Sequence, residues 1–160
     1  MHLFIFHYLC IKTMSQLDPV DILIVEDNPH DAELMVRTLS KQKLANKIFI
    51  AEDGVEALDF IFCHGIFSGR DKIRPPKVIF LDLKLPKVNG LEVLNEIKSN
   101  VETKKIPVVI ITSSKEDPDI KTAYDLGANS YIVKPVDFVE FMHAIGTTGL
   151  YWLLINEAPR

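Results

Sequence analysis

The fold is set by one stretch near the start of the chain, ILIVEDNP at residues 22–29. Its four aliphatic residues predict a short buried strand. Asn28 is a good helix N-cap, and Pro29 suits the first position of a helix. The next residues place apolar side chains at i, i+3, i+4 and i+7, on one face of a helix: Ala32, Met35, Val36 and Leu39. The first predicted unit is therefore a strand that leads directly into a helix.

The same unit recurs along the chain. Further strands are predicted at residues 47–51, 78–81, 108–111 and 130–133, each followed by a stretch with helical spacing. Asp53 and Glu56 resemble a capping box for the second helix, and Gly127 is the expected C-cap of the fourth. Apolar strands that alternate with helices are typical of a parallel sheet covered on both faces. We therefore predict an α/β fold with one doubly wound, five-stranded parallel sheet.

Length and composition limit the classes of function. The chain has 160 residues, 48% of them hydrophobic and 25% charged, which suits one globular domain. Its formal net charge is −4, and because nucleic-acid binding needs a basic surface, no nucleic acid is expected as a partner. Cys10 and Cys63 are far apart and show no metal-binding spacing, so neither a disulfide framework nor a zinc site is expected. The predicted compartment is the cytoplasm.

Both ends of the chain are predicted to lie outside the domain, which we place at residues 18–149. Residues 1–17 contain an apolar run that is shorter than the roughly 20 residues needed to span a bilayer, and they lack the basic start of a signal peptide. We expect this extension to be disordered or to precede the true start at Met14, and we predict no membrane association. Gly146 and Gly149 are expected to interrupt the last helix before an apolar tail at residues 150–160.

Polar residues follow four of the five predicted strands. Glu26 and Asp27 come after the first strand, Asp82 after the third, Thr112 at the end of the fourth and Lys134 after the fifth. Open parallel sheets bind ligands at this carboxyl edge, where the strand order reverses. In the order 2-1-3-4-5 the first and third strands would be neighbours there. Three carboxylates would then converge beside a hydroxyl and an ammonium group.

This combination suits phosphoryl transfer to an aspartate. Clustered carboxylates repel one another unless a cation intervenes, and Mg²⁺ binds oxygen ligands together with phosphate. The ammonium of Lys134 can neutralise one phosphoryl oxygen, and the hydroxyl of Thr112 can donate to another. Each position alone has an ordinary explanation, a helix cap or a Lys-Pro turn, but their joint occurrence favours a site. Glu52 and Asp53, after the second strand, are interpreted as structural.

Several motifs together resemble the response-regulator receiver family from about residue 20 to about residue 145. They are residues 22–27, 51–58, 78–86 with Asn89-Gly90, 108–113 and 127–135. The resemblance implies a flavodoxin-like receiver fold with strand order 2-1-3-4-5. It also implies that a histidine kinase phosphorylates Asp82. Mg²⁺ would be held by Asp27, Asp82 and the backbone carbonyl of Lys84. Glu26 would act on the metal mainly through water.

The resemblance further implies a conformational switch. With Asp82, the catalytic set would contain Thr112 and Lys134, which match the switch hydroxyl and the lysine of the family motif. Thr112 would move toward the new phosphoryl oxygens, and Tyr131, the switch aromatic, would turn inward. The surface formed by the fourth helix, the fifth strand and the fifth helix would change for partner binding or dimerisation. The bond between Lys134 and Pro135 would be cis.

A narrower resemblance is to the stand-alone regulators that pair with bacterial phytochrome histidine kinases. It rests on the long loop before the third strand, on Ser130-Tyr131, on residues 135–138 and on the late aromatic tail. In that subgroup the late segment contributes to a homodimer. Residues 151–154 would here be exposed apolar surface unless docked, and a tail packed on its own domain is an equal alternative.

Three other functions fit the residues less well. An aspartate-nucleophile phosphatase needs a second acid two residues after the nucleophile, where this chain has Lys84. A flavin or nucleotide binder is disfavoured because acids, and no glycine-rich motif, follow the first strand. A receiver that works without phosphorylation is disfavoured by the full acidic set with Thr112 and Lys134. The predicted protein is a phosphorylation-driven switch that catalyses its own phosphorylation and hydrolysis, and it is not an enzyme with a separate substrate.

Overall fold

Five parallel strands form one sheet in the part of the chain that the computed structural model describes, residues 20–43 and 47–158. They are β1 (Ile22–Val25), β2 (Ile48–Ala51), β3 (Val78–Leu81), β4 (Val108–Thr112) and β5 (Ser130–Val133). The sheet order is β2-β1-β3-β4-β5, which confirms the predicted doubly wound α/β fold. The predicted N-terminal extension, residues 1–17, lies outside the described residues.

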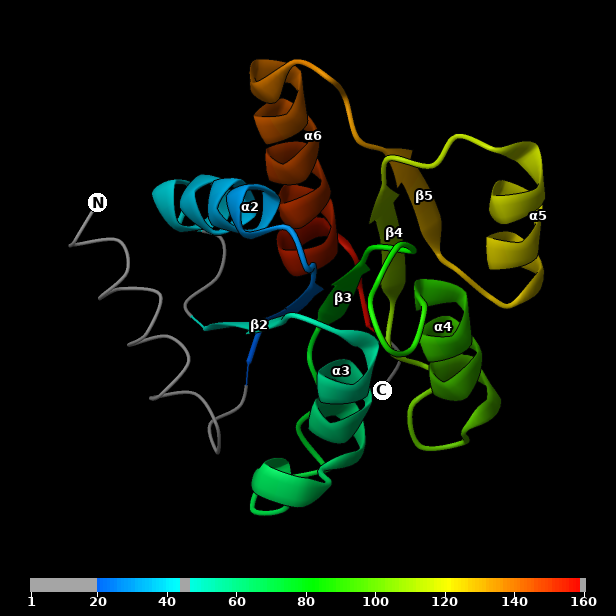
Figure 1. The fold of residues 1–160 in the computed structure, drawn as a ribbon. Helices are drawn as coiled ribbons and strands as arrows, with labels where there is room; N and C mark the ends of the chain where they lie inside the picture. Colours follow the sequence, from blue (N-terminus) through cyan, green and yellow to red (C-terminus); the bar gives the residue numbers. More distant parts are fainter. Residues whose placement is uncertain (1–19, 44–46, 159–160) are drawn as a thin grey trace.

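Helices cover both faces of this sheet (Figure 1). They are α2 (Pro29–Lys41), α3 (Gly54–Phe62), α4 (Gly90–Ser99), α5 (Asp117–Asp125) and α6 (Phe138–Leu150), with a short 3₁₀-helix, η1 (Gly65–Phe67), and a π-helical segment, η2 (Tyr151–Ile155). Side chains of β1 alternate between two apolar clusters: Leu23 and Val25 pack with α3 and α4, whereas Ile22 and Ile24 pack with α2 and α6. Every residue of β1 to β4 is buried, but β5 is only partly buried.

The two predicted helix N-caps are present, one after β1 and the other after β2. Asn28 accepts hydrogen bonds from the N–H groups of His30 and Asp31 at the start of α2. Asp53 accepts from the N–H of Glu56 at the start of α3. Each cap satisfies backbone donors that the first turn of a helix leaves free. Each helix can therefore begin only a few residues after its strand.

The last helix is longer than the sequence predicts. α6 continues through Gly146 and Gly149 to Leu150 and leads directly into η2, so the predicted interruption is wrong. Both glycines are buried, and a Cβ at Gly146 would lie 2.4 Å from the side chain of Gln42, which follows α2. Packing of α6 against α2 and the sheet therefore outweighs the low helix propensity of the two glycines.

The segment after α6 is partly docked and partly exposed. Trp152 and Leu153 pack against the apolar cluster beneath α2 and α6, whereas the side chains of Leu154 and Ile155 face solvent. By length and composition, the continuous helical segment Phe138–Ile155 could cross a membrane. This is weak evidence, because core helices of soluble proteins pass the same test and one face of this segment packs into the core.

Candidate functional site

Three carboxylates meet at the carboxyl edge of the sheet. Glu26 and Asp27 follow β1, and Asp82 follows β3, the strand paired with β1. One oxygen atom from each carboxylate lies within 4.8 Å of the others. Glu26 and Asp82 expose only 2% and 5% of their surfaces, whereas Asp27 is exposed to solvent. We call these three residues the acidic cluster.

The ammonium of Lys134 lies against this acidic cluster. Its Nζ donates to Oε2 of Glu26 at 2.5 Å and to Oδ2 of Asp82 at 2.9 Å. A third carboxylate partner is Asp31, whose Oδ2 lies 2.9 Å from the same nitrogen. Sequence reasoning did not select Asp31, although an acid in the first turn of the helix that follows Glu26 and Asp27 was a usable signal.

Burial and charge shift the ionisation of this ion-pair network. Burial raises the pKa of Glu26 to about 7, with Lys134 acting against the shift and Asp82 adding to it. Burial alone would lower the pKa of Lys134, but the carboxylates of Glu26 and Asp82 outweigh it and raise that pKa above its ordinary value. The ammonium therefore stays charged beside its partners.

The donor set of the acidic cluster fits a hard divalent cation. It supplies carboxylate oxygens only, within a few ångströms of one another, and such ligands suit Mg²⁺ and Mn²⁺. A cation there would also relieve the repulsion between two buried carboxylates and an exposed one. Lys84 is exposed, and its backbone N–H donates to Oδ1 of Asp82 at 3.1 Å. The role of its carbonyl as a metal ligand stays a prediction.

Two further groups predicted from sequence lie on β4 and β5: Thr112 ends β4, and Tyr131 is the second residue of β5. Thr112 is fully buried, and its carbonyl accepts from the backbone N–H of Lys134 at 2.8 Å. Tyr131 is half-buried, and its hydroxyl donates to the carbonyl of Ser114 at 2.9 Å. Burial raises the pKa of Tyr131, so its phenol stays protonated at neutral pH and available as a donor. Thr112 therefore lies at the same edge of the sheet as the acidic cluster, and the hydroxyl of Tyr131 reaches the loop that follows β4 at that edge.

Comparison with known sequences assigns the chain to a family. The sequence pattern described as the response regulator receiver domain matches residues 22–146, which include every group described above. The chain belongs to the response regulator receiver family. One curated relative, "Probable methanogenesis regulatory protein FilR2" of Methanothrix harundinacea, is 39% identical over 142 residues, which cover 89% of this chain and 89% of FilR2. Response regulator Rcp1 of Synechocystis is 34% identical over 141 residues, which cover 88% of this chain and 94% of Rcp1.

Solved structures agree in both fold and chemistry. The Mn²⁺-bound form of Rcp1 aligns with a TM-score of 0.82 at 33% identity, over 89% of this chain and 100% of that one. Phosphorylated RcpA, a cyanobacterial phytochrome response regulator, aligns with a TM-score of 0.83 at 33% identity and the same coverage. The predicted resemblance to receivers and to stand-alone phytochrome regulators is confirmed. Receivers bind a divalent metal at their acidic pocket and are phosphorylated by histidine kinases, so this chain is a phosphoryl-accepting switch of two-component signalling.

One expectation for the receiver site is wrong. The bond between Lys134 and Pro135 is trans, and no cis bond occurs among the described residues. A trans bond is the ordinary state before proline, favoured by about 0.5–1 kcal/mol. With this geometry the Lys134 side chain already reaches Glu26, Asp31 and Asp82, so its contacts do not need the cis form.

The loop that carries Asp82 is held in place by close backbone packing. A Cβ at Gly90 would lie 2.2 Å from the carbonyl oxygen of Asp82, so only glycine fits there. Nζ of Lys87, in the same loop, lies 2.8 Å from Oδ2 of Asp53. Asp53 therefore caps α3, as the sequence predicts. It also pairs with Lys87 in the loop that carries Asp82, a contact that the sequence did not show.

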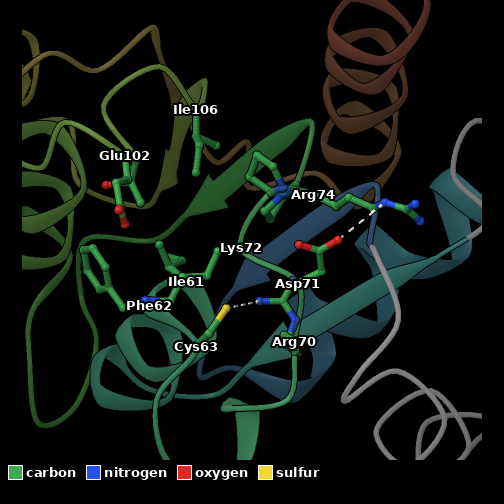
Figure 2. Close-up of a pocket in the computed structure, with 12 residues that line it drawn as sticks. Ile61, Phe62, Cys63, Arg70, Asp71, Lys72, Arg74, Glu102 and Ile106 are labelled. Atoms are coloured by element: carbon green, nitrogen blue, oxygen red, sulfur yellow. Dashed lines mark hydrogen bonds and ion pairs between the residues drawn. The ribbon is translucent and has the colours of Figure 1, made fainter.

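A small cavity lies at the opposite edge of the receiver, between the end of α3 and the loops that precede β3 and β4 (Figure 2). Its volume is about 20 Å³, close to that of one water molecule. Arg70 lines it, 93% buried, in the segment that the sequence predicts only as a polar loop. The guanidinium donates to the carbonyl of Phe60 and lies 3.9 Å from Sγ of Cys63. This cavity is part of the loop packing and is separate from the acidic cluster.

Proposed function

We propose that Asp82 is the residue that accepts the phosphoryl group. The observation that carries this is the environment of its carboxylate: it is 95% buried at the sheet edge, with Oδ2 bound to the Lys134 ammonium and Oδ1 bound to the Lys84 N–H. These donors orient the carboxylate for attack. A buried, oriented aspartate beside a cation is what transfer of a phosphoryl group to a carboxylate needs.

The reaction is a displacement at phosphorus. A carboxylate oxygen of Asp82 forms a bond to phosphorus, while the bond from phosphorus to the imidazole nitrogen of a kinase phosphohistidine breaks. The imidazole keeps the electron pair and takes a proton, so a neutral histidine leaves. Lys134 neutralises charge on the transferred group, and Thr112 donates to one of its oxygens. Hydrolysis of the acyl phosphate by water would return Asp82 to its starting state, which makes the chain a switch without a separate substrate.

The metal of this receiver is proposed to be Mg²⁺. Asp27, Asp82 and the carbonyl of Lys84 would hold it, with Glu26 acting mainly through water. When bound, the ion supplies positive charge that screens the carboxylates and draws a phosphoryl oxygen toward Asp82. The exposed position of Asp27 next to two buried acids supports this, because it leaves one side of the cluster open to solvent and to the donor.

The output is proposed to be a change in the surface formed by α5, β5 and α6, which corresponds to the fourth helix, fifth strand and fifth helix of the family. Thr112 would move toward the phosphoryl oxygens, and Tyr131 would leave the carbonyl of Ser114 and turn inward. Partial burial of β5 and the exposed side chains of Val136 and Phe138 support this surface as the one that partners bind.

The partners are proposed from the same evidence. Likeness to phytochrome response regulators supports a phytochrome-type histidine kinase as the phosphoryl donor, with the receiver at residues 18–149 acting in the cytoplasm. The exposed side chains of Leu154 and Ile155 support a homodimer that uses the tail after α6 as well as the α5-β5-α6 surface.

Intact-mass measurement after incubation with acetyl phosphate and Mg²⁺ tests the central proposal. The wild-type protein is expected to gain the mass of one phosphoryl group, and Asp82→Asn is expected to gain none. Asp125→Asn is the matched control, because that aspartate is exposed on α5 and pairs only with Lys121 among the contacts described. Phosphoryl mass on Asp82→Asn, or none on the wild-type protein, contradicts the proposal.

A further inference from the structure

The ammonium of Lys134 has three hydrogens, and it is bound to three carboxylates. Two of these, Glu26 and Asp82, belong to the acidic cluster with Asp27. Asp31 is the partner that lies outside that cluster. Its side chain is 33% exposed, compared with 1% for Glu26 and 6% for Asp82. The lysine is therefore anchored on two sides, by the acidic cluster and by the first turn of α2.

The start of α2 fixes the position of Asp31 relative to the cluster. Oδ1 of Asn28 accepts from the N–H of Asp31 at 3.2 Å, and the N–H of Asn28 donates to Oε1 of Glu26 at 3.0 Å. One capping residue thus ties the backbone of Asp31 to the side chain of Glu26. The helix cap therefore holds Asp31 at the site, within hydrogen-bond distance of Lys134.

We propose that Asp31 is a positioning residue that holds Lys134 at Asp82 when a divalent cation occupies the acidic cluster. This inference rests on the proposed function of Asp82. A cation that draws on the oxygens of Glu26 and Asp82 weakens their attraction for the ammonium, because their negative charge is then shared. Asp31 keeps its full charge and its hydrogen bond. Lys134 therefore remains next to Asp82, ready to receive a phosphoryl oxygen.

A purely structural role makes a different prediction. An acid in the first turn of a helix stabilises that helix through its dipole, and its loss would lower the stability of α2 without changing what Lys134 does. If Asp31 instead positions Lys134, its effect on phosphorylation depends entirely on the presence of the Lys134 ammonium. The two roles are separated by measuring Lys134 directly and by asking whether Asp31 matters once Lys134 has been removed.

The first test measures the rate of phosphorylation by acetyl phosphate at saturating Mg²⁺. Asp31→Ala is expected to slow it about tenfold, the effect of losing one charge-assisted hydrogen bond at a partly exposed site. Asp31→Asn keeps an acceptor oxygen and is expected to fall between Asp31→Ala and the wild type. Glu33→Gln is the matched control, because Glu33 is an acid on the same helix that pairs with Arg37 on the surface. An unchanged or faster rate for Asp31→Ala overturns the proposal.

The second test is a double-mutant cycle. In a Lys134→Ala background, Asp31→Ala is expected to cause no further loss of rate, because its effect passes through the missing ammonium. A further tenfold loss in that background overturns the proposal. Circular dichroism and thermal unfolding of each variant check that it is folded, so that a lost helix is not mistaken for lost positioning. If the wild-type protein itself is not phosphorylated, the proposed function fails, whereas normal rates in Asp31→Ala refute this inference alone.

The third test needs no phosphoryl donor. In protein with ¹⁵N-labelled lysine, the ammonium of Lys134 is expected to give an NMR signal protected from solvent exchange, because it is 90% buried and fully bonded. The signal is expected to persist in the wild-type protein when Mg²⁺ is added. In Asp31→Ala it is expected to disappear with Mg²⁺, and its persistence there contradicts the proposal.

Discussion

The guanidinium of Arg70 stacks on the ring of Phe60, with its Cζ 3.5 Å from the ring centroid, and its Nη1 donates to the carbonyl of the same residue. Phe60 lies in the last turn of α3, and its carbonyl also accepts a long hydrogen bond, 3.4 Å, from the N–H of the C-cap residue Cys63. Arg70 therefore ties the loop before β3 to the end of α3. Burial lowers the pKa of the guanidinium. Stacking and the carbonyl bond offset part of that cost of burial.

Arg70→Ala is expected to lower the free energy of unfolding by about 2–4 kcal/mol, because it leaves the buried carbonyl of Phe60 with only the long bond from Cys63 and opens a cavity beside the Phe60 ring. Urea denaturation measures the change. Arg74→Ala is the control, since that side chain is exposed and its 3.7 Å contact with Asp71 is worth under about 1 kcal/mol. Equal stability losses in the two variants would contradict the assigned role of Arg70.

Arg70 also shows why sequence reasoning predicts some parts of this receiver better than others. The strands β1, β3 and β5 have the predicted bounds, because a short apolar run between polar residues is the usual pattern of a buried strand. A buried arginine in a polar loop gives no such pattern. Its position depends on a contact with Phe60, ten residues earlier in the chain, that no local periodicity reveals.

Gly90→Ala is expected to destabilise the protein by about 1–3 kcal/mol or more and to slow phosphorylation, because the new Cβ would lie 2.2 Å from the backbone of Asp82. Gly146→Ala is the matched comparison. There the new Cβ would meet the flexible end of the Gln42 side chain, and alanine favours a helix over glycine by about 1 kcal/mol. Thermal unfolding of both variants checks this, and a larger loss for Gly146→Ala would refute it.

Acid titration should reveal the pairing of Asp53 with Lys87. Burial acts to raise the pKa of Asp53, but hydrogen bonds from Lys87 and from the N–H of Glu56 outweigh it and lower that pKa below its ordinary value of 3.8. The stability from this pair is therefore present above pH 3.8 and is lost as the pH falls through the lower pKa of the folded protein. Asp53→Asn keeps the cap but loses the charge, so its deficit against the wild type should be constant near neutral pH and shrink in acid. Urea unfolding at several pH values measures this, and a deficit that grows in acid would have the wrong sign.

Self-association should depend on the exposed tail. Leu154→Glu with Ile155→Glu is expected to weaken any dimer of the phosphorylated protein at least tenfold, because charged groups would replace apolar surface in the contact. Analytical ultracentrifugation measures the association. Val101→Glu is the control, since Val101 is exposed in the loop before β4. Association that survives the tail variants would exclude the tail from the interface.

At the acidic site, too, positions set by local sequence are predicted and positions set by distant contacts are not. Five site residues are predicted because each ends or follows a strand, and the parallel sheet brings such positions to one edge. They are Glu26, Asp27, Asp82, Thr112 and Lys134. Asp31 is one turn further on, and only the side-chain direction at the start of α2 brings it to Lys134. The helix through Gly146 is missed for a related reason: local propensity counts glycine as a breaker, and the packing against Gln42 is a distant contact.

The partial burial of β5 has a consequence for how the receiver opens in solution. β5 lies at the edge of the sheet beside β4, and each of its residues is at most partly buried, whereas β1 and β3 are fully enclosed. An edge strand with little enclosed apolar surface separates at a lower free-energy cost than central strands. Amide protons of β5 should therefore exchange with deuterium well before those of β1 and β3. Glu26 and Asp82 follow the enclosed strands β1 and β3, whereas Lys134 directly follows β5. Local opening at β5 would therefore draw the ammonium away from these carboxylates while the strands that carry them stay paired.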